Sequence, residues 1–66
     1  MRITVNDQVR EVPDGSTVAQ LLAILAIPAT RAAVEVDRAL VRRADHAGRV
    51  LGEGAVVEIV TLVGGG

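Results

Sequence analysis

The 66-residue chain lacks cysteine, lysine and every aromatic residue. Without cysteine it can hold no persulfide and no zinc–thiolate site of its own. Without lysine it can form no lysine Schiff base with a carbonyl substrate and has no lysine nucleophile. With no aromatic side chain to stack on bases and a net charge of −1, nucleic acid is not expected as a partner.

Long apolar runs and a leader segment are missing as well. The longest apolar stretch, 21–29, falls far short of the roughly 18 residues that a membrane-spanning helix needs. No basic and apolar signal segment follows Met1. We therefore expect a cytoplasmic protein that does not associate with a membrane.

Side chains for conventional catalysis are few. Ser16 and His46 are the only nucleophile–base pair available, but Ser16 suits a turn before a helix and His46 lies in a polar stretch, where we expect it on the surface. Asp45 and His46 supply too few ligands for a zinc site, so no metal is expected. The chain is therefore not expected to be an enzyme.

Four arginines, Arg38, Arg42, Arg43 and Arg49, gather in the second half of the chain. They form either a solvated face or a docking surface for an acidic partner. The surrounding segment, 43–51, is polar with alanine and glycine, which indicates a loop or a single helical turn.

Alternation of polar and apolar residues predicts the strands. Residues 2–6 and 9–12 should form a hairpin, because asparagine and aspartate between them tolerate left-handed backbone. Three further strands are expected at 32–36, at 40–42 and at about 55–62.

One helix is predicted between these strands. Thr17 and Gln20 have the spacing of a capping box, so the helix should begin near Val18. Pro28 disfavours helical geometry at the residue before it, which places the helix end near Ala26. An apolar stripe along this helix must pack on a sheet.

This order of elements predicts an α+β fold of the β-grasp (ubiquitin-like) type, with a mixed four- to five-stranded sheet packed on one main helix. Residues 1–63 would form a single β-grasp domain, followed by a flexible tail at 64–66. The last strand is apolar on both faces, with Val57 and Ile59 on one and Val56, Val60 and Leu62 on the other. Either a partner covers its end, or the strand is central and covered within the domain.

Three glycines, Gly64, Gly65 and Gly66, end the sequence. Having no Cβ atoms, such a tail could thread a narrow channel and present its terminal carboxylate to a partner's active site. A frayed chain end is the alternative. A carboxylate is a poor acyl donor, but coupling to AMP would let a sulfur or nitrogen nucleophile displace the leaving group.

The chain resembles the ThiS family, the sulfur carriers of thiamine biosynthesis, over nearly its whole length. The resemblance rests on the hairpin at Val5-Asn6-Asp7, the Pro13-Asp14-Gly15-Ser16-Thr17-Val18 segment, the segments 34–37 and 54–60, and the terminal glycines. Asp7 stands where glycine is common in the family and Asp37 where asparagine is frequent, but both residues still suit turns.

The resemblance implies a carrier that binds no cofactor itself. A ThiF-type (E1-like) adenylyltransferase would use ATP and Mg²⁺ to adenylate Gly66, with Gly65 and Gly64 giving access. A cysteine desulfurase or sulfurtransferase would supply sulfur for a thiocarboxylate, and a ThiG-type thiazole synthase would consume it. Val60, Leu62 and Val63 are predicted to form a docking strip for these partners.

Three other hypotheses about the function stay open. The small subunit of molybdopterin synthase resembles this fold and tail, although it is usually longer and often carries aromatic residues. The chain could also be a non-catalytic β-grasp interaction module, or an autonomous enzyme, for which its side-chain inventory is poor.

Overall fold

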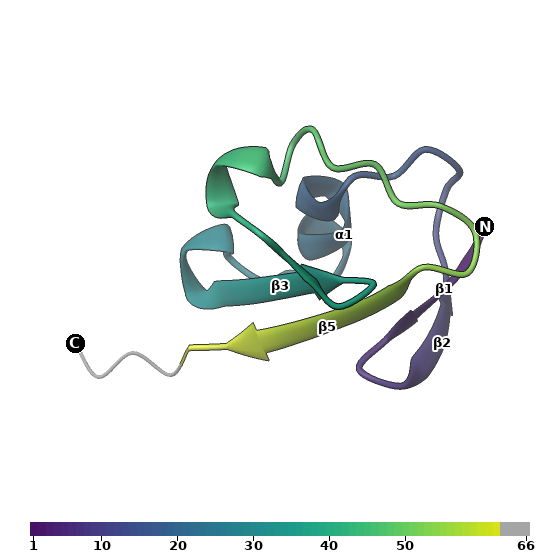
Figure 1. Cartoon of the computed structure of the whole chain (residues 1–66), viewed down its shortest axis with the longest axis horizontal. Coiled ribbons are helices and arrows are strands. Elements are labelled where there is room, and N and C mark those ends of the chain that lie inside the picture. Colours follow the sequence, from purple (N-terminus) through teal and green to yellow (C-terminus); the bar gives the residue numbers. More distant parts are fainter. Residues whose placement is uncertain (63–66) are drawn as a thin grey trace.

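Five strands and one α-helix are present in the computed structural model, which describes residues 1–62 (Figure 1). The strands are β1 (Arg2–Val5), β2 (Gln8–Glu11), β3 (Ala32–Val36), β4 (Ala39–Val41) and β5 (Val56–Thr61). Helix α1 spans Val18–Ile24, and two 3-10 helices, η1 and η2, span Ala29–Arg31 and Arg43–Asp45. The strand order is β2-β1-β5-β3-β4, with β1 and β5 parallel and the other pairs antiparallel. The predicted β-grasp fold is confirmed, with five strands.

Two-residue turns close both hairpins. Asn6 and Asp7 have φ values of 50° and 67°, and Asp37 and Arg38 have values of 51° and 69°. Positive φ at both central residues is the mark of a type I′ turn, whose twist matches that of the flanking strands. The second turn is thus one residue shorter than predicted, and Ala39 already belongs to β4.

The predicted capping box starts α1. The Thr17 hydroxyl accepts a hydrogen bond from the Gln20 N–H at 3.2 Å, and the Gln20 side chain accepts one from the Thr17 N–H at 2.9 Å. Val18, Leu21 and Leu22 are buried against the sheet, as the apolar stripe predicts. The helix is therefore fixed by its cap and by one packed face.

The helix ends at Ile24, before the predicted end near Ala26. Ala26 has a φ of 57°, and its N–H donates to the Ala23 carbonyl at 3.1 Å. The Ile27 N–H donates to the Leu22 carbonyl at 2.9 Å. These two bonds make a Schellman motif, in which an alanine takes the left-handed position that glycine usually occupies. The motif, rather than Pro28, sets the helix end.

The core is entirely aliphatic and lies between α1 and one face of the sheet (Figure 1). Each strand except β2 contributes a buried side chain to it, and the largest fully buried ones are Ile3, Leu21, Leu51, Val18, Val34, Val36 and Val57. Val56 and Val60, on the other face of β5, are exposed. The strand is central, but the described domain covers only one of its faces.

The segment 43–51 covers the N-terminal end of α1. It contains the single turn η2, in agreement with the sequence-based prediction. The Arg49 and His46 carbonyls accept hydrogen bonds from the Val18 and Ala19 N–H groups, each at 3.0 Å. These bonds satisfy two donors that a helix start leaves without an intrahelical partner.

The expectation that His46 lies on the surface is wrong, because His46 is only 4% exposed. Its Nε2 atom lies 3.2 Å from the Val41 carbonyl oxygen, and no hydrogen-bond partner of its Nδ1 atom is present within residues 1–62. The carbonyls of this polar segment accept hydrogen bonds from the start of α1, which holds the segment against the helix. The imidazole is buried as a result.

Asn6 fixes β5 beside β1. Its main-chain N–H donates to the Val57 carbonyl at 2.9 Å. Its side-chain amide then donates to the Ile59 carbonyl at 3.0 Å and accepts from the Ile59 N–H at 2.8 Å. The side chain thereby continues the β1–β5 ladder beyond the end of β1.

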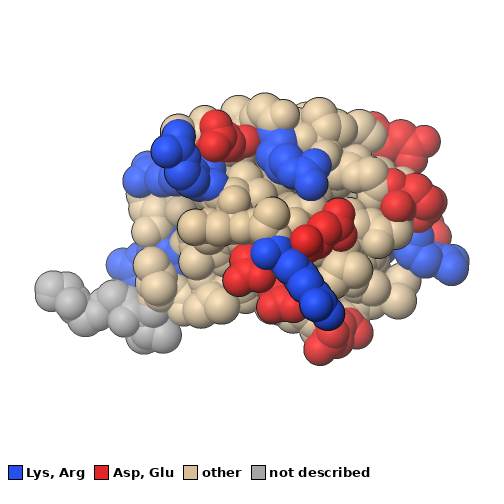
Figure 2. Space-filling view, in the orientation of Figure 1, with Lys and Arg blue, Asp and Glu red and all other residues tan. Residues whose placement is uncertain are grey.

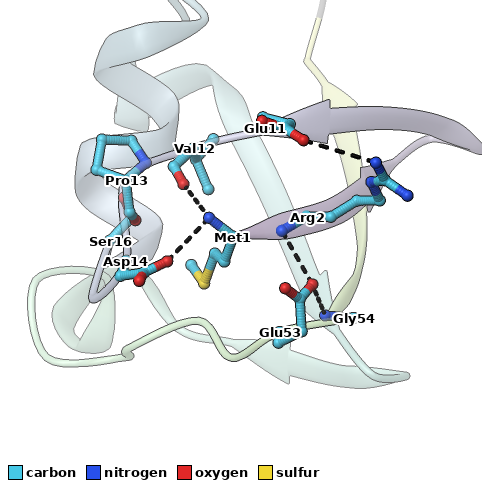
Figure 3. A network of polar contacts seen from close by, with 9 residues as sticks. All are labelled: Met1, Arg2, Glu11, Val12, Pro13, Asp14, Ser16, Glu53 and Gly54. Atoms are coloured by element: carbon cyan, nitrogen blue, oxygen red, sulfur yellow. Dashed lines mark hydrogen bonds and ion pairs between the residues drawn. The ribbon is translucent and has the colours of Figure 1, made fainter.

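A second polar network ties the chain start to the loop after β2 (Figure 3). The Met1 ammonium lies 2.9 Å from the Asp14 carboxylate and donates to the Val12 carbonyl at 2.8 Å. The hydrogen bond to Asp14 raises the pKa of the ammonium above its usual value near 8.0. The same bond lowers the pKa of Asp14 below its usual value near 3.8.

We predict that Asn6→Gly lowers the free energy of unfolding by about 2 kcal/mol, roughly 1 kcal/mol for each side-chain hydrogen bond lost. Glycine keeps the positive φ accessible, so the loss reports on the clamp and not on the turn. The matched control is Asp7→Gly, which should leave stability unchanged or slightly raised because glycine favours this turn position. Urea denaturation measures both, and equal stabilities of the two variants would contradict the clamp.

The Met1–Asp14 pair predicts a pH-dependent contribution to stability. An ammonium whose pKa is raised on folding stabilises below its unfolded value and stops doing so as the pH rises through its folded value. A carboxylate whose pKa is lowered stabilises above its unfolded value and stops as the pH falls through its folded value. Asp14→Asn should therefore lower the urea midpoint between about pH 4 and pH 8, and its effect should fade as the pH falls below 3.8 or rises above 8.0. A constant difference from pH 3 to pH 10 would contradict the assignment.

Candidate functional site

The site predicted from the sequence begins at the end of β5. Val60 and Leu62 are 62% and 55% exposed, and both lie on the sheet face that α1 leaves open. The Leu62 N–H donates to the Arg31 carbonyl at 2.7 Å, so the chain is held against the start of β3 up to its last described residue. The other predicted site residues, Val63, Gly64, Gly65 and Gly66, lie outside the described residues.

The open face collects most of the exposed large hydrophobic side chains in residues 1–62. Seven such side chains are present among these residues, and strand register places five of them on this face, two of which lie on the edge strands β2 and β4. The five are Val9, Leu40, Val56, Val60 and Leu62. An exposed apolar set gathered on one face is typical of a surface that contacts another molecule. The docking strip predicted at Val60 and Leu62 is thus part of a larger surface.

Val9 and Leu40 were not predicted from the sequence to be members of this face. They lie on the two edge strands, β2 and β4, which bring them to the same side as Val60. The signal that could have placed them is the pairing register, because residues directly opposite each other in a ladder share a face. The order of strands across the sheet, which places each edge strand two positions from β5, cannot be predicted from any one segment.

A shallow cleft of about 230 Å³ lies beside the end of β5. Leu25, Ile27 and Ile59 contribute apolar side chains to it, and the lining is completed by Val5, Asn6, Gln8, Arg10 and Thr61. Every second residue of β5 directs its backbone N–H and carbonyl groups toward β3. Thr61 is not one of these residues, so its backbone groups point the other way, toward this cleft. The described lining includes no histidine, aspartate or glutamate that could act as a base toward the Thr61 hydroxyl.

The weak catalytic pair considered from the sequence does not form. Ser16 is 3% exposed, and its hydroxyl donates to the Pro13 carbonyl at 2.6 Å, as the turn reading predicts. His46 instead contacts the Val41 carbonyl. Within residues 1–62, no three histidine, aspartate or glutamate side chains are grouped so that they could hold a metal ion.

The four arginines of the second half are all exposed. Arg42 forms an ion pair with Asp45 at 3.6 Å, and Arg49 donates to the Val50 carbonyl at 2.7 Å. Figure 2 shows basic side chains in several separate places on the visible surface rather than in one continuous patch. This distribution favours solvated side chains over a docking surface for an acidic partner.

None of the helices in the described part of the chain has the length and apolar character needed to cross a membrane.

Comparison with known proteins places these features in a family. The sequence model of the ThiS family matches residues 2–66. The crystal structure of a thiamine biosynthesis protein (ThiS) from Geobacter metallireducens aligns with a TM-score of 0.85 and 28% identity, covering 100% of both chains. A solution structure of a thiamine biosynthesis protein from the same organism aligns with a TM-score of 0.82 and 28% identity, covering 100% of this chain and 88% of the other. No match is found among curated protein sequences.

Proposed function

The chain belongs to the ThiS family of small sulfur carriers of thiamine biosynthesis, and on that premise we propose that its sulfur travels on the terminal carbonyl of Gly66. In this role the protein is a co-substrate of partner enzymes and not a catalyst. The observation that supports the proposal best is the family match, which extends through the terminal glycines.

The proposed chemistry begins with activation. A ThiF-type adenylyltransferase with ATP and Mg²⁺ joins the Gly66 carboxylate to AMP and releases pyrophosphate. The terminal sulfur of a persulfide, supplied by a cysteine desulfurase or sulfurtransferase, then attacks the carbonyl carbon and AMP leaves. Cleavage of the resulting S–S bond by a thiol frees the thiocarboxylate and leaves a disulfide behind. A ThiG-type thiazole synthase takes the sulfur, and we place all these reactions in the cytoplasm.

The described residues support a role as a carrier on which partner enzymes act. Among the described residues, Ser16 and His46 contact different backbone carbonyls and no three histidine or acidic side chains are grouped for a metal ion, and the proposal assigns activation of the carboxylate to a partner enzyme. Strand β5 is bonded on both sides up to Ile59 and on the β3 side up to Leu62. A carrier built this way presents the residues that follow from a fixed direction, which shortens a partner's search for the reactive end.

The family match favours thiamine biosynthesis over molybdopterin synthesis, because both structural relatives are thiamine biosynthesis proteins. A plain interaction module would need no reactive end. If that alternative held, a ThiF-type enzyme would not adenylate the wild-type chain.

We predict that deleting Gly66 abolishes adenylation while leaving the fold intact. The shortened chain ends one residue short of the position at which the carboxylate reacts, and a displacement of this size removes the reacting geometry. Pyrophosphate release with the cognate ThiF-type enzyme measures the activity, and circular dichroism checks the fold. Adenylation of the deletion variant at the wild-type rate would contradict the assignment of Gly66.

We also predict that Leu62→Glu weakens binding to the adenylyltransferase by more than about 1 kcal/mol, since it places a charge in the proposed docking strip. Leu62 is exposed, so the variant should unfold at nearly the wild-type urea concentration. Val50→Glu, at an equally exposed valine outside the open face, is the matched control and should bind normally. Unchanged affinity of the Leu62 variant in a titration would refute the docking strip.

A further inference from the structure

The open face of the sheet carries two neighbouring glutamates that the stability of the fold does not explain. Glu35 on β3 and Glu58 on β5 are register partners, so their side chains project from the same face. Directly opposite residues in a ladder have Cβ atoms about 5 Å apart, and like charges in such positions are destabilising. Both glutamates are exposed, and neither forms an ion pair within 4.0 Å in residues 1–62.

Nearby charges do not neutralise the pair. Arg38 borders a hollow of about 450 Å³ together with Asp7, Asp37 and Glu58, so one cation faces three carboxylates there. Figure 2 shows acidic side chains on both sides of a basic one on the visible surface. The local excess is therefore negative, in contrast with the neutral Arg2–Glu11 pair on the β1–β2 side of the same face.

Apolar side chains surround the two glutamates. Leu40 is the register partner of Glu35 on its other side, and Val56 and Val60 flank Glu58 along β5. All three apolar side chains are exposed. An arginine or lysine that approached between the carboxylates would thus lose its water against an apolar rim, which strengthens a charged contact.

We propose that the Glu35–Glu58 pair is a specificity element that takes a basic side chain, best an arginine, from the docking face of the adenylyltransferase. A guanidinium presents parallel N–H donors that can bond one carboxylate bidentately and reach the second. Repulsion between the two carboxylates destabilises the folded carrier when it is free, and a bound cation relieves this repulsion. The inference rests on the proposed function, because it takes the adenylating enzyme as the occupant of the open face.

Charge complementarity and continuity of the face select this occupant. Glu58 lies on the same strand and the same face as Val60, and Leu62, the residue after that strand, leads into the end that the enzyme must receive. An acidic partner would meet a second negative surface, and a second copy of this chain would oppose glutamates to glutamates. A basic partner surface is the one that turns the repulsion into attraction.

The test uses the full carrier, its cognate ThiF-type enzyme and the variants Glu35→Gln and Glu58→Gln. Each variant should raise the KM for the carrier about tenfold at low salt with little change in kcat, because a docking contact and not the reacting geometry is lost. The double variant should show a weaker dependence of KM on salt than the wild type. In the absence of enzyme, each single variant should unfold at a higher urea concentration than the wild type, since the repulsion is removed.

The matched control is Glu11→Gln, which removes one negative charge from the same face but from a site already paired with Arg2 at 3.7 Å. Its KM should stay within about twofold of the wild type. A wild-type KM in both glutamate variants, or an equal rise in the Glu11 variant, would overturn this inference while leaving the proposed function in place. Failure of the wild-type carrier to be adenylated at all would overturn both.

Discussion

The position of β5 depends on hydrogen bonds from both of its neighbours, and the rest of the molecule is arranged around them. On one side the Asn6 side chain bonds both polar groups of the Ile59 main chain. On the other, Asp37 accepts from the Val56 N–H at 3.0 Å through its carboxylate and donates its own N–H to the Val56 carbonyl at 2.7 Å. Each of these residues belongs to a type I′ turn, so the geometry that closes the two hairpins also fixes the central strand.

A chain of this size and composition has little with which to cover a sheet. Helix α1 has seven residues and no aromatic side chain is present, so the aliphatic core can fill only one side of the five strands. The other side keeps Val56, Val60 and Leu62 exposed. Because the small core covers only one face of the sheet, the other face is left open for a partner to bind, and this face adjoins the end of β5.

Local patterns in the sequence were sufficient for the first hairpin, the capping box and the strand at 32–36, because each rests on interactions between residues close in the chain. They were insufficient where distant segments decide the outcome. Ala26 adopts a left-handed conformation without being glycine, and His46 is buried because its loop supplies carbonyls to the start of α1. For the candidate site, the pattern indicated Val60 and Leu62, but the Glu35–Glu58 pairing follows only from the strand order.

The central claim, that sulfur is carried on Gly66, is tested most directly by mass spectrometry of the protein from its native host grown without thiamine. Replacing one carboxylate oxygen with sulfur adds about 16 Da, the same nominal mass as oxidation of Met1. Cleavage after Arg49, the last basic residue, releases the peptide 50–66, which contains neither methionine nor cysteine. We expect a fraction of this peptide to carry the added mass at Gly66. A peptide that is entirely unmodified while the cells are making thiamine would contradict it.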